Sequence, residues 1–257
     1  MIHFPHGQHA YSSIATARYA AEKRGEKTGM GRNGKMTDGS YGIRKIDEES
    51  IALAATLIRR GELVVIPTDT VYGVAADPTN PDAVARIFAA KRRPAQKAVQ
   101  VLLPSLDDLP RFGLSLPAPL DKLARALCPG GFSPICIAEA GCPFATVRVV
   151  EGERFPRTQG VRIPDSAAAH AILEATGPLA TSSANRSGDA SAQTVEEAYG
   201  ELGGAVALYL DGGPTPGPVS STVAAADPDA EDGIAILREG VISREKLKGA
   251  LRNAARR

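Results

Sequence analysis

The sequence lacks the features that define several common classes of protein. Its three cysteines are Cys128, Cys136 and Cys142, with no Cys-x-x-Cys pair and no neighbouring histidine, so neither a disulfide framework nor a zinc site is expected. An odd number of separate cysteines fits reduced thiols in a cytoplasmic protein. No run of about 18 apolar residues occurs, which argues against a membrane span. The first residues lack the apolar core of a secretory signal.

Motifs of several well-known enzyme classes are also missing. There is no phosphate-binding Gly-x-x-x-x-Gly-Lys-Ser/Thr loop, no protein-kinase motif set and no Gly-x-Ser-x-Gly nucleophile turn. Beyond residue 40 the sequence contains a single histidine, His170, and it falls in a predicted helix. The sequence therefore gives little support to serine–histidine hydrolysis or to acid–base catalysis by histidine.

The composition is that of an ordinary globular protein. Of the 257 residues, 43% are hydrophobic and 23% are charged. The formal net charge of +1 gives the whole molecule no attraction to nucleic acid, although a local basic patch is compatible with it. Residues 1–40 are rich in glycine and show little apolar periodicity. We expect a flexible N-terminal extension there and one domain over residues 41–257.

Helices and strands are predicted to intersperse along this domain. Asp47 can cap a helix whose apolar positions recur at helical spacing up to Arg60. Leu63–Ile66 is then a short apolar run bounded by glycine and proline, typical of a buried strand. The mix predicts an α/β fold with a twisted, mostly mixed open sheet flanked by helices around a central basic cavity. Further helices are predicted over residues 80–91, 120–127, 167–176, 194–202 and from 243, and further strands over residues 99–103, 135–138, 145–150, 160–163, 206–210, 221–225 and 234–238.

Segments rich in hydroxyls, glycine and arginine are predicted as loops that follow the strands. Open α/β sheets bind ligands in the crevice at the ends of their strands. A set of such loops spread over the domain fits one cavity better than several unrelated surface loops. The segments are Pro67–Gly73, Lys91–Lys97, Thr158–Arg162, Thr181–Ser191, Pro216–Thr222 and Arg238–Gly240.

Three adjacent cations, Lys91, Arg92 and Arg93, end one predicted helix. Cations at a helix C-terminus are commonly solvated side chains that favour the helix dipole. The alternative is a phosphate clamp, because the planar guanidinium of arginine matches phosphate oxygens. Pro94 stiffens the segment, which favours a loop preorganised for an anion.

Several motifs in order carry a resemblance to a known family. Lys91, Arg93 and Pro94 match a Lys-x-Arg-Pro pattern, and residues 183–188 match Ser-Ala-Asn-x-Ser-Gly. The chain resembles the YrdC/Sua5 family, the threonylcarbamoyl-adenylate synthases, over most of the predicted domain. The resemblance implies a single YrdC-like domain, the short form of the family. The other matching segments are Gly61–Gly73, Val161–Pro164, Ser221–Thr222 and Leu237–Gly240.

The resemblance implies a nucleotidyltransferase reaction. L-threonine, bicarbonate and ATP would give threonylcarbamoyl-AMP and pyrophosphate, with Mg²⁺ bridging the ATP phosphates and few protein ligands to the metal. The product serves the N6-threonylcarbamoyl modification of adenosine 37 in tRNA. The implied partners are therefore the downstream tRNA threonylcarbamoyl-transfer machinery and a direct contact with tRNA or double-stranded RNA. Such chemistry needs positioning and charge neutralisation rather than a protein nucleophile.

The resemblance also implies roles for individual residues. Lys91 and Arg93 are the implied catalytic residues, which hold the ATP phosphates. No residue is implied as a direct metal ligand. The implied ATP-binding residues are Arg93, Lys97, Thr158, Ser183, Asn185, Ser191 and Arg238, and the implied L-threonine-binding residues are Thr70, Arg162, Thr181 and Ser221.

Several positions depart from the family pattern. Leu102 stands where the family often has a histidine that contacts threonine, and Ser220 replaces a glutamate. Cys128–Ser133 replaces Trp-Pro-Gly-Pro-x-Thr, and Lys97 replaces a polar residue that contacts ATP. These changes keep two alternatives open. One is a divergent paralog that acts on another carbamoyl or amino-acid substrate, and the other is a non-catalytic protein that binds RNA or a nucleotide.

Overall fold

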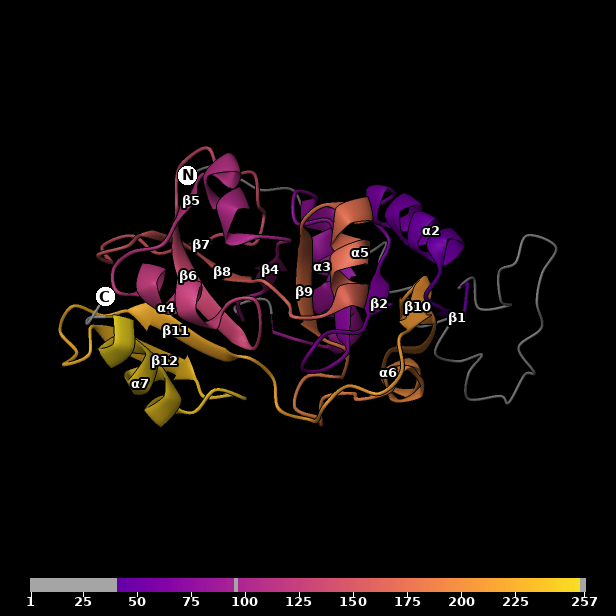
Figure 1. The fold of residues 1–257 in the computed structure, drawn as a ribbon. Coiled ribbons are helices and arrows are strands. Elements are labelled where there is room, and N and C mark those ends of the chain that lie inside the picture. The colour runs from indigo at the N-terminus through magenta and orange to yellow at the C-terminus, as the bar shows by residue number, and fades with distance from the viewer. Residues whose placement is uncertain (1–40, 95–96, 255–257) are drawn as a thin grey trace, which may run out of the picture.

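The computed structural model describes residues 41–94 and 97–254 (Figure 1). The predicted N-terminal extension, residues 1–40, lies outside the described residues. The strands are β1 (Ile43–Lys45), β2 (Val64–Ile66), β3 (Gly73–Ala76), β4 (Gln100–Leu102), β5 (Leu114–Ser115), β6 (Phe132–Ala138), β7 (Arg148–Val149), β8 (Arg157–Arg162), β9 (Leu179–Ser183), β10 (Leu208–Asp211), β11 (Thr222–Ala226) and β12 (Ile234–Arg238). The helices are α2 (Glu48–Arg59), α3 (Pro81–Lys91), α4 (Leu120–Leu127), α5 (Ala167–Thr176), α6 (Val195–Leu202) and α7 (Arg244–Ala254), with 3₁₀ helices η1 (Leu106–Phe112) and η2 (Gly203–Ala205).

The strands join into one open, mixed sheet, as the sequence predicted. Its order is β1-β10-β2-β3-β9-β4-β8-β6-β11-β12, with β5 beside β6 and β7 beside β8. The parallel neighbours are β1 with β10, β10 with β2, β4 with β8, and β6 with β11. Val101 of β4 pairs with Val161 on one side and with Ala180 on the other. The strand order therefore brings three distant parts of the chain together in the middle of the sheet.

Helices cover both faces of the half of the sheet that contains β1–β3, β9 and β10 (Figure 1). Val64 and Ile66 share a core with residues of α2 and α5, whereas Val65 shares a core with residues of α3 and α6. Successive side chains of a strand point to opposite faces of the sheet. Helices cover both faces of the sheet here and exclude water, which explains why β2 is apolar at every position.

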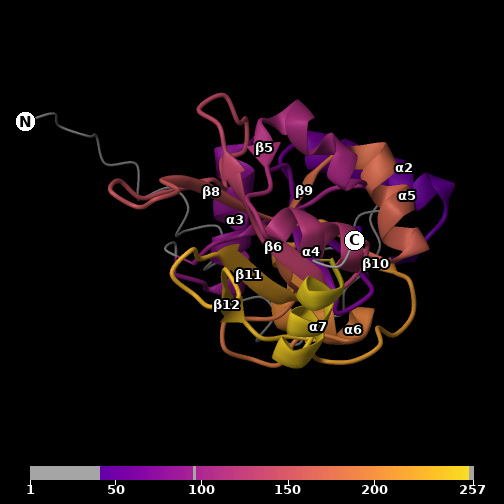
Figure 2. The ribbon, with the colours of Figure 1, turned by 60° about the vertical axis from the view of Figure 1, so that its left-hand side comes forward.

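The other half of the sheet carries α4 and α7 on one side (Figure 2). Leu123, Phe132 and Leu247 are fully buried in the core between these helices and β6, β11 and β12. A further core next to η1 contains Cys136, and burial raises the pKa of its thiol well above the ordinary range. The three cysteines are free, in agreement with the expected reduced thiols. Among the described helices, none is both long and apolar enough to cross a membrane.

Local sequence explains where α2 begins and ends. The carboxylate of Asp47 accepts a hydrogen bond from the Ser50 N–H at 2.7 Å, and the Ser50 hydroxyl oxygen accepts one from the Asp47 N–H at 3.0 Å. This reciprocal capping box satisfies two donors that the helix itself cannot use. Gly61 follows the C-cap with a φ of +74°, a left-handed conformation that favours glycine.

One segment predicted as a loop lies in a strand instead. Thr181–Ser183 forms the end of β9, and the strand predicted from residue 160 begins earlier, so that Thr158 also falls inside β8. Serine and threonine favour turns locally. However, β9 pairs with β3 on one side and β4 on the other, with Ser183 opposite Gly73 and Thr181 opposite Gln100. Backbone pairing on both edges therefore outweighs the local turn preference. Thr222 begins β11 and Arg238 ends β12, in agreement with the strands predicted over residues 221–225 and 234–238.

Candidate active site

A cavity of about 150 Å³ opens against the middle of the sheet. Its wall is built from the loop of residues 67–73, β4, β6, β8 and β9, with the segment that enters β11 and the end of β12. The predicted site residues that line it are Thr70, Arg93, Arg162, Thr181, Ser183, Ser221 and Arg238. The predicted site residues outside its lining are Lys91, Lys97, Thr158, Asn185 and Ser191.

Arg162 is a preorganised cation on the cavity wall. Its side chain is 3% exposed, and its Nη2 lies 2.6 Å from the Asp69 carboxylate. Nη1 donates to the Thr70 hydroxyl at 2.7 Å, and Nε donates to the Gly130 carbonyl at 3.1 Å. A guanidinium carries five N–H donors, so these three bonds leave two for a ligand. The arrangement suits a carboxylate, which a guanidinium can bind through paired donors.

Arg238 holds Ser221 at another part of the wall. Its Nε and Nη2 donate to the Ser221 carbonyl at 3.1 and 2.8 Å, and Nη2 lies 3.2 Å from the Ser221 hydroxyl. Arg238 is exposed at the surface, but partial desolvation of its guanidinium lowers its pKa, and the charges of Arg162 and Arg93 lower it further. The three guanidiniums therefore repel one another, and an anion bound among them would relieve that repulsion.

Arg93 reaches the cavity because the chain turns sharply at the end of α3. Arg92 has a left-handed φ of 49°, which is uncommon outside glycine. Arg93 Nη2 donates to the Ala98 carbonyl at 3.0 Å. Within the described part of the chain, Nε of Arg93 is buried and has no acceptor. A buried N–H donor that lacks an acceptor and lies beside a cavity is suited to bind a ligand oxygen.

Lys91 has a different environment from Arg93. Its side chain is 1% exposed, and its ammonium donates to the backbone carbonyls of Ser183 and Asn185. The Lys91 carbonyl in turn accepts from the Ser187 N–H at 2.9 Å. Burial, together with the charge of Arg93, lowers the pKa of Lys91 to about 8. Lys91 thus fastens the end of α3 to the 183–187 segment and is not part of the cavity lining.

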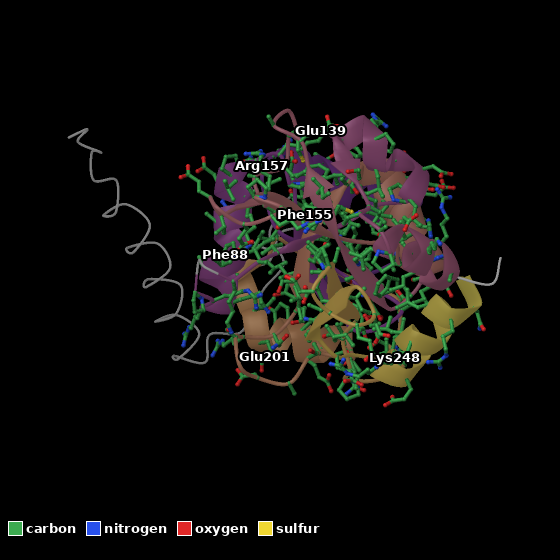
Figure 3. The ribbon with its side chains drawn as sticks, turned by 90° about the vertical axis from the view of Figure 1, so that its left-hand side faces the viewer. Phe88, Glu139, Phe155, Arg157, Glu201 and Lys248 are labelled. Atoms are coloured by element: carbon green, nitrogen blue, oxygen red, sulfur yellow. The ribbon has the colours of Figure 1, made fainter. Side chains whose placement is uncertain are left out.

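The loop after β9 is also held by its own residues and by α6. Asn185 Nδ2 donates to the carbonyls of Arg186 and Asp189, at 2.7 and 2.8 Å. Among the described residues, Oδ1 of Asn185 is buried and accepts no hydrogen bond. The Arg186 N–H donates to the carboxylate of Glu201 at 3.0 Å, and Figure 3 shows Glu201 on α6. These bonds fix the backbone that presents Ser183 to the cavity.

The remaining predicted residues lie farther out. Thr158 lies on the same face of β8 as Gly160 and Arg162, because side chains of a strand alternate. Lys97 is exposed, and Ser191 is half-buried in the loop before α6. The cavity lining therefore gathers the residues predicted for L-threonine, together with part of the set predicted for ATP.

Sequence reasoning did not name five polar residues of the lining as site residues. Thr68, Ser182 and Ser220 lie within the loop segments that it listed, whereas Gln100 and Ser133 do not. The Ser133 hydroxyl donates to Gln100 Oε1 at 2.8 Å and lies 2.8 Å from the Ser221 hydroxyl. One signal could have identified Gln100: it is polar inside the apolar run from Val99 to Leu103. Leu102, two residues later, also lines the cavity and is fully buried.

The residues that meet at the cavity and the fold around them belong to a known class of protein. A family model named Sua5_yciO_yrdC, described as "Telomere recombination", matches residues 56–240. This match covers most of the chain. The chain therefore belongs to the Sua5/YciO/YrdC family.

Individual relatives extend this result. Threonylcarbamoyl-AMP synthase of Bacillus subtilis is 34% identical over 208 residues, which cover 80% of this chain and 57% of that protein. The structure of Pyrococcus abyssi Sua5 complexed with L-threonine matches with a TM-score of 0.69 and 31% identity, over 81% of this chain and 59% of that chain. Escherichia coli YciO matches with a TM-score of 0.67 and 24% identity, over 79% of this chain and 96% of that chain. This chain spans less than two thirds of the B. subtilis and P. abyssi proteins.

Proposed function

We propose that this chain is an L-threonylcarbamoyladenylate synthase, a nucleotidyltransferase that uses L-threonine, bicarbonate and ATP. Its family, the name of the B. subtilis relative and the L-threonine complex of P. abyssi Sua5 support this proposal. The observation that carries it is the cavity wall. A buried guanidinium with two free donors, Arg162, shares that wall with Arg93 and Arg238. Such a wall suits a small carboxylate and a polyphosphate bound side by side.

The proposed reaction proceeds in two steps. The nitrogen of L-threonine bonds to the carbon of bicarbonate with loss of water, which gives a carbamate. A carbamate oxygen then bonds to the α-phosphorus of ATP, and the bond from that phosphorus to pyrophosphate breaks. Arg162 orients the amino-acid carboxylate, with Thr70, Thr181 and Ser221 around the rest of the molecule. Proximity and orientation of this kind replace a protein nucleophile.

Charge neutralisation is assigned to the other arginines. Arg93 and Arg238 face the developing negative charge on the phosphates, and Ser183 offers a hydroxyl beside them. Mg²⁺ would enter with ATP and screen its phosphates. The cavity lining offers hydroxyls and guanidiniums, so it suits a metal held mainly by phosphate oxygens. The part of the chain that the structure describes contains no group of three or more His, Cys, Asp or Glu residues that could hold a metal ion.

The product defines the partners. An acyl adenylate is a reactive mixed anhydride, so an enzyme that transfers the threonylcarbamoyl group must consume it. We assign that step to the machinery that modifies adenosine 37 of tRNA. We place both reactions in the cytoplasm. Contact of this chain with tRNA or double-stranded RNA is part of the same proposal. It predicts binding that weakens with salt, because phosphate contacts release counterions.

A second candidate function rests on Leu102. This side chain is fully buried and aliphatic where the family often has a histidine that contacts threonine. A paralog that uses another amino acid or carbamoyl acceptor would have the same ATP chemistry with a different acceptor pocket.

Pyrophosphate release separates these functions. The full chain is incubated with ATP and Mg²⁺, and L-threonine or bicarbonate is omitted in turn. Release that requires both establishes the synthase. Release with another amino acid, and not with L-threonine, establishes the paralog. Folded protein that binds ATP and releases no pyrophosphate with any amino acid contradicts both catalytic functions.

A further inference from the structure

Gln100 is a polar side chain in an otherwise apolar strand. Its neighbours Val101, Leu102 and Leu103 are fully buried, whereas Gln100 is half-buried and lines the cavity. A polar residue in such a strand costs free energy unless its hydrogen bonds are made. Its position therefore calls for a partner for each end of the amide.

One end of the amide is satisfied by the protein. The carbonyl oxygen Oε1 accepts from the Ser133 hydroxyl at 2.8 Å. Ser133 is itself 1% exposed and lies 2.8 Å from the hydroxyl of Ser221, whose Oγ also receives Arg238 Nη2. Ser133 has a single hydroxyl proton for two acceptors, and with Oε1 of Gln100 turned toward Ser133 that proton lies on Gln100 Oε1. The bond to Ser133 thus fixes which way the amide faces.

The other end of the amide is open to the cavity. In residues 41–94 and 97–254, no protein atom accepts a hydrogen bond from Nε2 of Gln100. This nitrogen is also not one of the buried polar atoms that lack a hydrogen-bond partner. Two N–H donors therefore face the space that the predicted L-threonine contacts surround. Thr181 lies directly beside Gln100 in the sheet, and Ser221 is joined to it through Ser133.

An apolar surface lies next to these donors. Ile135 and Val223 are half-buried and form an apolar part of the lining, and the fully buried Leu102 lies on the same face of β4 as Gln100, two residues later. The wall therefore offers a hydrogen-bond donor and an aliphatic contact close together. A short side chain that carries one hydroxyl and one methyl group complements such a wall.

We propose that Gln100 is a specificity-determining residue that donates to the side-chain hydroxyl of the amino-acid substrate, while the apolar part of the lining contacts its methyl group. This inference rests on the proposed function, because it takes Arg162 as the partner of the substrate carboxylate. It assigns the recognition of the substrate hydroxyl to β4. The substrate class is β-hydroxy amino acids with a methyl group, as in L-threonine.

The test compares three amino acids that differ by one group. L-serine lacks the methyl group of L-threonine, and L-2-aminobutyrate lacks its hydroxyl. The kcat/KM of the full chain for each is measured by pyrophosphate release, and binding is measured by calorimetry without ATP. Gln100→Met keeps the size of the side chain and removes the donors. Gln193→Met, outside the cavity lining, is the matched control.

The wild type is expected to prefer L-threonine over L-2-aminobutyrate by about tenfold or more, since a polar group left unpaired in the complex is costly. Gln100→Met should reduce that preference to within about twofold and leave the preference for L-threonine over L-serine unchanged. A merely structural role would lower the kcat/KM for all three amino acids together. If Gln100→Met does not fold, Gln100→Leu also lacks the donors, cannot accept from the substrate hydroxyl and should lose the same preference.

Two negative outcomes are distinguishable. Wild-type activity with a hydroxyl preference that survives in Gln100→Met overturns the role of Gln100 and leaves the proposed function standing. Wild-type protein that neither binds these amino acids nor releases pyrophosphate with them overturns the proposed function, and the role of Gln100 with it.

Discussion

The arginines of the cavity are held in two opposite ways. Arg162 is almost completely buried and already bonded to Asp69, Thr70 and Gly130 before any ligand binds. Arg93 makes one hydrogen bond to a backbone carbonyl and keeps a buried Nε without an acceptor among the described residues. A guanidinium that is already held in place by three hydrogen bonds suits one small anion in one orientation. A guanidinium with few protein partners suits a polyphosphate, because the several phosphate oxygens can accept from its remaining N–H donors and neutralise its charge.

The largest effect is expected at Arg162. Arg162→Lys keeps the charge and loses the planar fork, so it should raise the KM for L-threonine by about 100-fold and change the KM for ATP little. Steady-state pyrophosphate release at varied L-threonine and varied ATP measures both. Arg148→Lys, in an exposed pair with Glu153, is the matched control. An unchanged KM for L-threonine would remove Arg162 from the amino-acid site.

Arg93 should show the complementary pattern. Arg93→Met is expected to raise the KM for ATP by about tenfold, because a charge-assisted bond to phosphate is lost, while calorimetric binding of L-threonine stays as in the wild type. The adjacent Arg92→Lys serves as control, since it keeps a cation at the exposed neighbouring position. Equal kinetics in Arg93→Met and the wild type would exclude a phosphate clamp at this residue.

Lys91 gives a pH-dependent effect of intermediate size. Its folded pKa of about 8 lies below the ordinary value of 10.5, so the unfolded chain binds more protons between these values. The free energy of unfolding therefore rises with pH through that window, and this contribution is lost as the pH falls through about 8. Relative to Lys91→Met, the wild type should gain about 1–2 kcal/mol between pH 7.5 and pH 9.5, as measured by urea unfolding. A constant difference between the two proteins across this range would contradict a lowered pKa.

The smallest effect is expected at the surface. Arg148 and Glu153 lie 2.7 Å apart, but their side chains are 50% and 45% exposed. Arg148→Ala should change the free energy of unfolding by less than about 0.5 kcal/mol, because solvent screens exposed ion pairs. Thermal unfolding of this variant calibrates the difference from the buried pair of Arg162 and Asp69. A loss of several kcal/mol here would show that exposure is a poor guide to ion-pair strength in this protein.

Much of the local structure was predictable. The helix predicted up to Arg60 begins at the Asp47 cap and ends before Gly61, because capping and left-handed turns depend on residues three or four positions apart. The strands predicted over residues 63–66 and 99–103 are present as β2 and β4. The strand character of Thr181–Ser183 was not predictable in this way, since it arises from pairing with β3 and β4 on both sides.

The candidate site was predictable as a set of residues and less so as an arrangement. The motifs indicated Arg162, Arg93 and Ser183, and all three line one cavity. The same motifs did not indicate that the Lys91 ammonium points away to the carbonyls of Ser183 and Asn185. Lysine and arginine have equal charge, and the path of the backbone decides which of the two faces the cavity. Their individual roles in binding ATP and L-threonine are still predictions.

The sequence by itself therefore determined the family, the helix boundaries and the residue types available for chemistry, because these follow from local patterns along the chain. Only the tertiary structure decided which of these side chains meet. Ser133 is separated from Gln100 by 33 positions and from Ser221 by 88, yet the three are joined by hydrogen bonds. That contact depends on strand order, in which β4, β8, β6 and β11 lie side by side. Strand order is set by burying apolar surface across the whole sheet, and no short segment contains that information.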